Sequence, residues 1–171
     1  KYPRINGGGS ATLRPFHLEN PLDELSKVFT VDYAQGYDEE HTNSEMMKEV
    51  IRVAQENETV IFFCGSPSSM DTEGADRNHM ELPDSHLHLF SIIRQYATEV
   101  IVVLNNGSAL NLQPLLEADA LLEAWYLGGA NGKAIVDIIT GKVNPSGRLS
   151  ETFPLRLTDT PFFATFPSKQ D

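Results

Sequence analysis

Three runs of mostly apolar residues stand out along the chain. They cover residues 59–64, 100–104 and 120–125, and the first two show no alternation between apolar and polar positions. Continuous apolar runs of this length are typical of strands that are buried on both faces of a parallel sheet. Each run is followed by glycine, or by asparagine and glycine, which end strands and begin loops. We therefore predict a strand at each run.

The segments between these runs predict helices. Pro21 and Pro83 suit first helical turns, and Asn43 or Ser44 suits an N-cap. Alternating strands and helices predict an α/β fold, a layered sandwich with a mostly parallel sheet flanked by helices on both faces. Shorter extended stretches bring the expected number of strands to at least four, with the additional strands at 31–34 and 148–153. The predicted helices cover residues 21–28, 44–54, 83–97, 112–116 and 132–140.

The composition suits one domain with a substantial core. Of the 171 residues, 40% are hydrophobic and 22% are charged. The formal net charge of −11 opposes binding to nucleic acid and to anionic membranes. The lone cysteine, Cys64, lies in an apolar run, where we expect a buried thiol without an intrachain disulfide. No signal peptide and no run of 18 apolar residues are visible, so we expect a cytoplasmic protein.

The loop at residues 65–81 holds the most informative group of polar residues. Glu73 stands near its centre beside Gly74, which adds no side chain and lets a ligand approach closely. Asp76 and Arg77 can anchor the loop through ionic hydrogen bonds. Because ligands of α/β proteins bind where strands end in loops, Glu73 is a candidate catalytic residue. The alternative is a solvated loop with ordinary surface charges.

Other motifs resemble known site motifs but lack the required context. Residues 7–10 (GGGS) follow no strand and precede a poor helix start, which argues against a phosphate-binding loop. They fit a tight loop at the rim of a ligand site, or a plain turn. The serines at 66–69 lack G-x-S-x-G spacing, which argues against a serine hydrolase. His86 and His88 point to different faces of a helix and make a poor metal pair.

A single loop carboxylate amounts to half of a glycosidase site. Glu73 can act as a general acid if burial raises its pKa. Retaining glycoside hydrolysis needs two carboxyl groups about 5–5.5 Å apart, one of them the nucleophile. The candidates Asp32, Asp38 and Asp119 are equally well explained as surface charges.

An ordered set of short motifs resembles a known family. Each motif alone is weak, but the ordered set, ending in N-P-S-G-R-L and T-F-P, is specific. Together they resemble the C-terminal α/β-sandwich domain of glycoside hydrolase family 3, in particular its bacterial β-glucosidases. The resemblance covers nearly the whole chain. The motifs are Pro3-Arg4 with residues 7–10, Glu73-Gly74-Ala75-Asp76-Arg77, Ala124-Trp125-Tyr126, Gly132-Lys133-Ala134, and residues 141–149 (GKVNPSGRL) with Thr152-Phe153-Pro154.

The resemblance implies a retaining β-glycosidase built from two domains. A (β/α)₈ barrel would carry the Asp nucleophile, and this domain would supply Glu73 as acid/base for terminal β-D-glucosyl residues. No metal or organic cofactor is implied. The resemblance also places the glycine-rich segment near the aglycone side of the substrate cleft. The substrate-binding residues that we expect on this basis are Gly8, Gly9, Ser10, Asp76 and Arg77.

The resemblance also sets the expected domain organisation. Residues 1–171 would be the C-terminal domain of a family 3 enzyme, without the catalytic barrel and without the domain's own first strand. We therefore expect an unpaired sheet edge and little activity in the isolated chain. The alternative is a non-catalytic α/β domain that only packs on a barrel or binds sugar.

Overall fold

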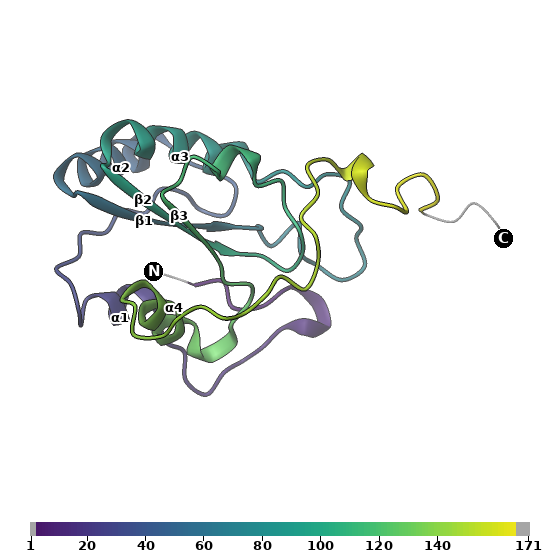
Figure 1. The fold of residues 1–171 in the computed structure, drawn as a ribbon, viewed down its shortest axis with the longest axis horizontal. Helices are drawn as coiled ribbons and strands as arrows, with labels where there is room; N and C mark the ends of the chain where they lie inside the picture. The colour runs from purple at the N-terminus through teal and green to yellow at the C-terminus, as the bar shows by residue number, and fades with distance from the viewer. Residues whose placement is uncertain (1–2, 167–171) are drawn as a thin grey trace.

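The three apolar runs form one parallel sheet in the computed structural model, which describes residues 3–166. The strands are β1 (Thr59–Gly65), β2 (Glu99–Asn105) and β3 (Ala120–Glu123), in the order β1-β2-β3. Both pairings are parallel, with Thr59 opposite Glu99 and Ile101 opposite Ala120. Helices lie on both faces of this sheet (Figure 1). The predicted α/β class, and the predicted neighbourhood of the three strands, are therefore confirmed.

Two long helices cover one face of the sheet. They are α2 (Ser44–Glu56) and α3 (Asp84–Tyr96), drawn above the strands in Figure 1. The side chain of Asn43 caps α2 by accepting the backbone N–H groups of Glu45 and Met46 at 3.0 and 2.9 Å. The main core lies beneath these helices, and its most deeply buried side chains include Leu89, Phe90, Ile93, Val100, Val102 and Leu104.

Two shorter helices cover the opposite face. They are α1 (Pro21–Leu25) and α4 (Asn131–Ile139), which lie together below the sheet in Figure 1. Ile135 of α4 packs on Val103 and Ala124, which forms a second and smaller core. Alternate residues of β1 and β2 thus enter different cores, which explains why the middle positions of these strands are apolar.

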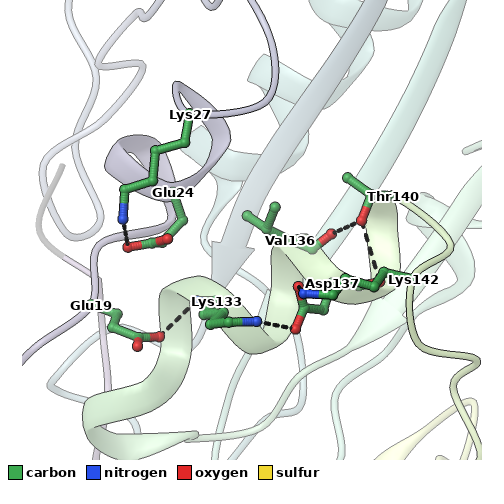
Figure 2. A network of polar contacts seen from close by, with 8 residues as sticks. All are labelled: Glu19, Glu24, Lys27, Lys133, Val136, Asp137, Thr140 and Lys142. Carbon is green, nitrogen blue, oxygen red and sulfur yellow. Dashed lines mark hydrogen bonds and ion pairs between the residues drawn. The ribbon is translucent and has the colours of Figure 1, made fainter.

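A chain of polar contacts connects α4 to the segment before α1 (Figure 2). Glu19 accepts the backbone N–H of Lys133 at 2.9 Å, where a negative charge interacts favourably with the start of the helix. The side chains of Lys133 and Lys142 both pair with Asp137. Exposed ion pairs of this kind contribute little to stability. The contact of Glu19 with the backbone of α4 fixes the path of the chain before α1.

The two additional predicted strands are absent from the described residues. Residues 31–34 form no ladder with β1, because a cavity that both segments line lies between them, and Asp32 and Tyr33 are exposed. Residues 148–153 bend at positions 150 and 151, are mostly exposed and form no ladder. Glu151 accepts the N–H of Ala109 at 2.9 Å. The described part of the sheet has three strands, so the prediction of at least four is wrong there.

Other short segments form 3₁₀ turns. The predicted helix at 112–116 is one of them, because Pro114 limits the regular hydrogen bonds of a longer helix. The turns are η1 (Gly9–Ala11), η2 (Gln113–Leu115), η3 (Gly128–Ala130) and η4 (Leu157–Asp159). Among the described residues, no helix is long and apolar enough to cross a lipid bilayer.

The outer edge of β1 borders a cavity of about 790 Å³. The carbonyl of Glu58 accepts the N–H of Glu99 on the β2 side, so alternate residues of β1 direct their backbone groups the other way. The hydroxyl of Tyr37 donates to one of these groups, the carbonyl of Phe63, at 3.0 Å. Among the described residues, no strand pairs with this side. The residues whose backbone faces outward are Thr59, Ile61, Phe63 and Gly65.

Candidate active site

A second cavity, of about 560 Å³, lies where the loops after the three strands meet the glycine-rich segment. The loop after β1 contributes Glu73, Asp76 and Arg77 to its lining, and the glycine-rich segment contributes Gly8 and Ser10. The structure therefore brings together five of the six residues that the sequence indicated. Gly107 after β2 and Tyr126 after β3 complete the opposite wall.

Glu73 is held against the glycine-rich segment. Its Oε2 accepts the backbone N–H of Ser10 at 2.8 Å. Gly9, the sixth predicted residue, does not line the cavity but packs directly on Glu73. Its φ of +69° belongs to the left-handed region, and a Cβ there would lie 2.5 Å from the Cβ of Glu73. Glycine at position 9 therefore allows Glu73 to approach this backbone.

The carboxyl group of Glu73 is exposed and ionised in this chain. The N–H of Ser10 stabilises the charged form and lowers the pKa of Glu73 below its ordinary value. A general acid at neutral pH needs the opposite shift, which comes from burial. The geometry thus presents a carboxylate to the cavity, while the environment in the described residues does not raise its pKa.

Arg77 anchors the loop on the far side of Glu73. Its Nη2 donates to Ser108 Oγ at 2.5 Å and to the carbonyl of Ala109 at 3.3 Å, both in the segment after β2. This agrees with the anchoring role that its charge suggested. Asp76 is exposed and has no hydrogen-bond or ion-pair partner among residues 3–166, so it does not share this role.

Asp71 is a site residue that sequence reasoning missed. Its Oδ2 accepts the hydroxyl of Tyr126 at 2.5 Å and the N–H of Gly107 at 2.9 Å. Its own carbonyl accepts the N–H of Gly8 at 2.8 Å. These partners lie far away in sequence, and the only local signal was that Asp71 stands two residues before Glu73.

Comparisons with known proteins identify the family. The model of the glycosyl hydrolase family 3 C-terminal domain matches residues 2–171. The chain belongs to this family. Thermostable β-glucosidase B of Acetivibrio thermocellus is 32% identical over 177 residues, which cover all of this chain and 23% of that protein. An exo-α-(1→6)-L-arabinopyranosidase of Bifidobacterium longum is 33% identical over 172 residues, or 98% of this chain and 23% of that protein.

Solved structures of family 3 enzymes share the fold of this domain. The β-glucosidase of Bifidobacterium adolescentis matches with a TM-score of 0.87 and 32% identity over 95% of this chain and 25% of that one. The β-glucosidase of Listeria innocua, in complex with isofagomine, matches with a TM-score of 0.84 and 27% identity over 98% of this chain and 23% of that one. The chain spans about a quarter of the length of these relatives.

Glu123 is a half-buried carboxyl group that does not line this cavity. Glu123 at the end of β3 accepts the N–H of Trp125 at 2.8 Å and the side-chain amide of Asn106 at 3.4 Å. Burial raises the pKa of Glu123 to about 7, and the nearby Glu151 adds to the shift. The half-buried ring of the neighbouring Trp125 packs on Phe153 at 5.7 Å between centroids.

The other acidic candidates do not meet Glu73. Asp119 accepts the N–H of Val100 at 2.8 Å and pairs with Arg94, near the start of β2 and away from the cavity. Asp32 accepts the side chain of Asn57, and Asp38 bridges to His41. None of the three lines the cavity, so they do not supply a nucleophile to Glu73.

Proposed function

We propose that this domain supplies the acid/base residue of a retaining β-glycosidase that hydrolyses terminal, non-reducing β-D-glucosyl residues. The observation that carries the proposal is the position of Glu73, in a cavity formed by three strand-end loops and the glycine-rich segment. The family match and the β-glucosidase relatives support the same reaction class.

Glu73 acts twice in this proposal. It first protonates the glycosidic oxygen while a second carboxylate attacks the anomeric carbon and the bond to the aglycone breaks. It then removes a proton from the water that releases the covalent glycosyl intermediate. No metal or organic cofactor takes part in either step. Gly8, Gly9, Ser10, Asp76 and Arg77 shape the side of the cavity that receives the aglycone.

The second carboxylate comes from a (β/α)₈ barrel of the same protein. Supporting this, none of the acidic residues proposed as alternatives shares the cavity with Glu73, and the chain spans about a quarter of its relatives. A barrel placed over the cavity also excludes water from Glu73. Desolvation then raises the pKa that the N–H of Ser10 lowers in the exposed state.

We further propose that the outer edge of β1 receives a strand from an upstream segment of the full-length protein. Two observations support this part of the proposal. The outward backbone groups of β1 face a cavity of about 790 Å³, and Pro3 and Arg4 line that same cavity. An extended apolar segment continuous with Pro3 would satisfy the free backbone groups and fill the space. The proposed substrates of the whole enzyme are carbohydrates. A cytoplasmic location remains a prediction.

The test is the replacement of Glu73 by Ala in the full-length protein. Alkyl and sugar leaving groups need a proton in the transition state, so their turnover should fall by about 10²–10⁴-fold. Activated aryl leaving groups depart without a proton, so the turnover of aryl glucosides should fall far less. The acidic limb of the pH–rate profile should survive, and the basic limb should flatten. Aryl β-D-glucosides and α-L-arabinopyranosides together cover the activities named for the relatives.

Glu81→Ala is the matched control. Glu81 lies in the same loop, is exposed, and accepts only the N–H of its neighbour Met80 at 3.0 Å besides a contact with His79. It should leave all substrates unaffected. If Glu73→Ala behaved like this control on every substrate, the domain would be non-catalytic. In that case it would pack on a barrel or bind sugar without taking part in the chemistry.

A further inference from the structure

One residue, Asp71, joins the segments that surround Glu73 through its side chain and its backbone carbonyl. Its carboxylate binds Tyr126 after β3 and the N–H of Gly107 after β2, while its carbonyl binds the N–H of Gly8. The four segments come from distant parts of the sequence, yet each meets the others at this residue. Replacing the Asp71 side chain therefore releases the contacts to the segments after β2 and β3 together, while the backbone contact with Gly8 is kept.

The contacts around Asp71 are close and charge-assisted. Hydrogen bonds to an ionised carboxylate are about twice as strong as neutral ones. Arg4 supports the cluster from outside, because its Nε donates to the hydroxyl of Tyr126 at 3.0 Å and its guanidinium lies 5.5 Å from that ring. A Cβ at Gly107 would lie 3.0 Å from Tyr126 and 3.3 Å from the carboxyl carbon of Asp71. Glycine at position 107 therefore allows Asp71 and Tyr126 to pack closely on this backbone.

The backbone of Glu73 has few restraints of its own. Among the described residues, the stretch 72–76 makes hydrogen bonds to the rest of the domain only through the contact of Glu73 with Ser10. Gly74 adopts a φ of +83°, and a Cβ there would touch nothing within 4 Å. The position of Glu73 is therefore set by the anchors on either side of it, Asp71 before and Arg77 after.

We propose that Asp71 is a positioning residue for Glu73, which acts by holding the carboxylate-bearing loop against the strand ends and the glycine-rich segment. This inference rests on the proposed function of Glu73 as acid/base. Catalysis is sensitive to such placement, because a shift of about 1 Å can reduce a rate by roughly 10²-fold. In this role Asp71 acts through its Oδ2, which accepts from both Tyr126 and Gly107, and the proton exchange with the substrate is left to Glu73.

The test compares Asp71→Ala, Asp71→Asn and Glu73→Ala in the full-length enzyme. Asp71→Ala should lower kcat for alkyl glucosides by on the order of 10- to 100-fold and change kcat for activated aryl glucosides much less. Asn keeps one oxygen for the N–H of Gly107, so Asp71→Asn should recover part of the loss. Tyr126→Phe removes one donor, and it should give a smaller effect in the same direction even if Asp71→Ala fails to fold.

The pattern over leaving groups separates positioning from general stability. The inference would be overturned if Asp71→Ala slowed all substrates equally, or slowed none, while Glu73→Ala still slowed alkyl glucosides more than activated aryl glucosides. If Asp71→Ala does not fold, equal effects of Tyr126→Phe on alkyl and activated aryl glucosides would overturn the inference. If Glu73→Ala itself showed no discrimination, both the inference and the proposed function would fall. Glu81→Ala provides the unaffected reference for thermal stability and rate.

Discussion

At the scale of single residues, the position of the Glu73 carboxylate depends on the absence of a side chain at Gly9. Gly9 has no Cβ, so the backbone N–H of Ser10 comes within 2.8 Å of the carboxylate. The left-handed φ of Gly9 also favours glycine, because other residues adopt this conformation only with strain. Glycine at position 9 thus allows the contact with Ser10 that orients the carboxylate of Glu73.

Replacing Gly9 by Ala should displace Glu73. The new Cβ would stand 2.5 Å from the Cβ of Glu73, and alanine disfavours the φ of +69°. We expect a loss of about 1 kcal/mol or more in unfolding free energy and at least about a tenfold loss of kcat/KM for alkyl glucosides. Gly147→Ala is the control, because nothing lies within 4 Å of that position. Equal effects of the two substitutions would contradict the steric argument.

Glu123 should make the stability of the domain depend on pH. Its pKa is about 7 in the folded state against an ordinary value of 4.5, so folding favours the protonated form. This contribution to stability is complete below about pH 4.5 and is lost as the pH rises through about 7. Glu123→Gln should flatten that part of the curve of melting temperature against pH. An unchanged slope in the variant would show that another group is responsible.

Sequence reasoning found some site residues and missed others for a physical reason. Glu73 and Arg77 share one short loop, so their types and spacing are informative in the sequence itself. Asp71 and Glu123 act through partners on other strands and loops, and only the folded sheet brings those partners together. The shift in the pKa of Glu123 depends on burial, which a lone acidic residue in an apolar run does not reveal.

At the scale of elements, the strands buried on both faces were the most predictable. Helices cover both sides of β1 and β2, so the interior positions of these strands favour apolar side chains. The extended stretches at 31–34 and 148–153 failed as strand predictions because strand formation requires a neighbour to complete the ladder. Local composition specifies an extended backbone but does not specify its partner.

The outer edge of β1 leads to a prediction at this scale. Restoring the residues that precede the chain in the full-length protein should raise its melting temperature, because free backbone groups at the edge gain partners and the adjoining cavity fills. Differential scanning calorimetry of the short and extended forms measures this change. Light scattering should show that the short form associates more readily. A monomeric short form with the same melting temperature would contradict the assignment of this edge.

At the scale of the whole molecule, the domain provides a prepared but incomplete site. Glu73 is positioned by the glycine-rich segment and the Asp71 cluster, yet its carboxyl group is exposed and its pKa is lowered. The chain spans about a quarter of the length of its relatives. In the proposed enzyme, the barrel would supply both the burial and the nucleophile. The formal charge of −11 is compatible with a neutral sugar as substrate.

The most direct test of the acid/base assignment is chemical rescue of Glu73→Ala in the full-length protein. Azide attacks the glycosyl intermediate without help from a base, so it should restore turnover of an activated aryl β-glucoside. The product should be the β-glycosyl azide, identified by NMR, because two inversions retain the configuration. No rescue, with glucose as the only product at every azide concentration, would contradict the role of Glu73.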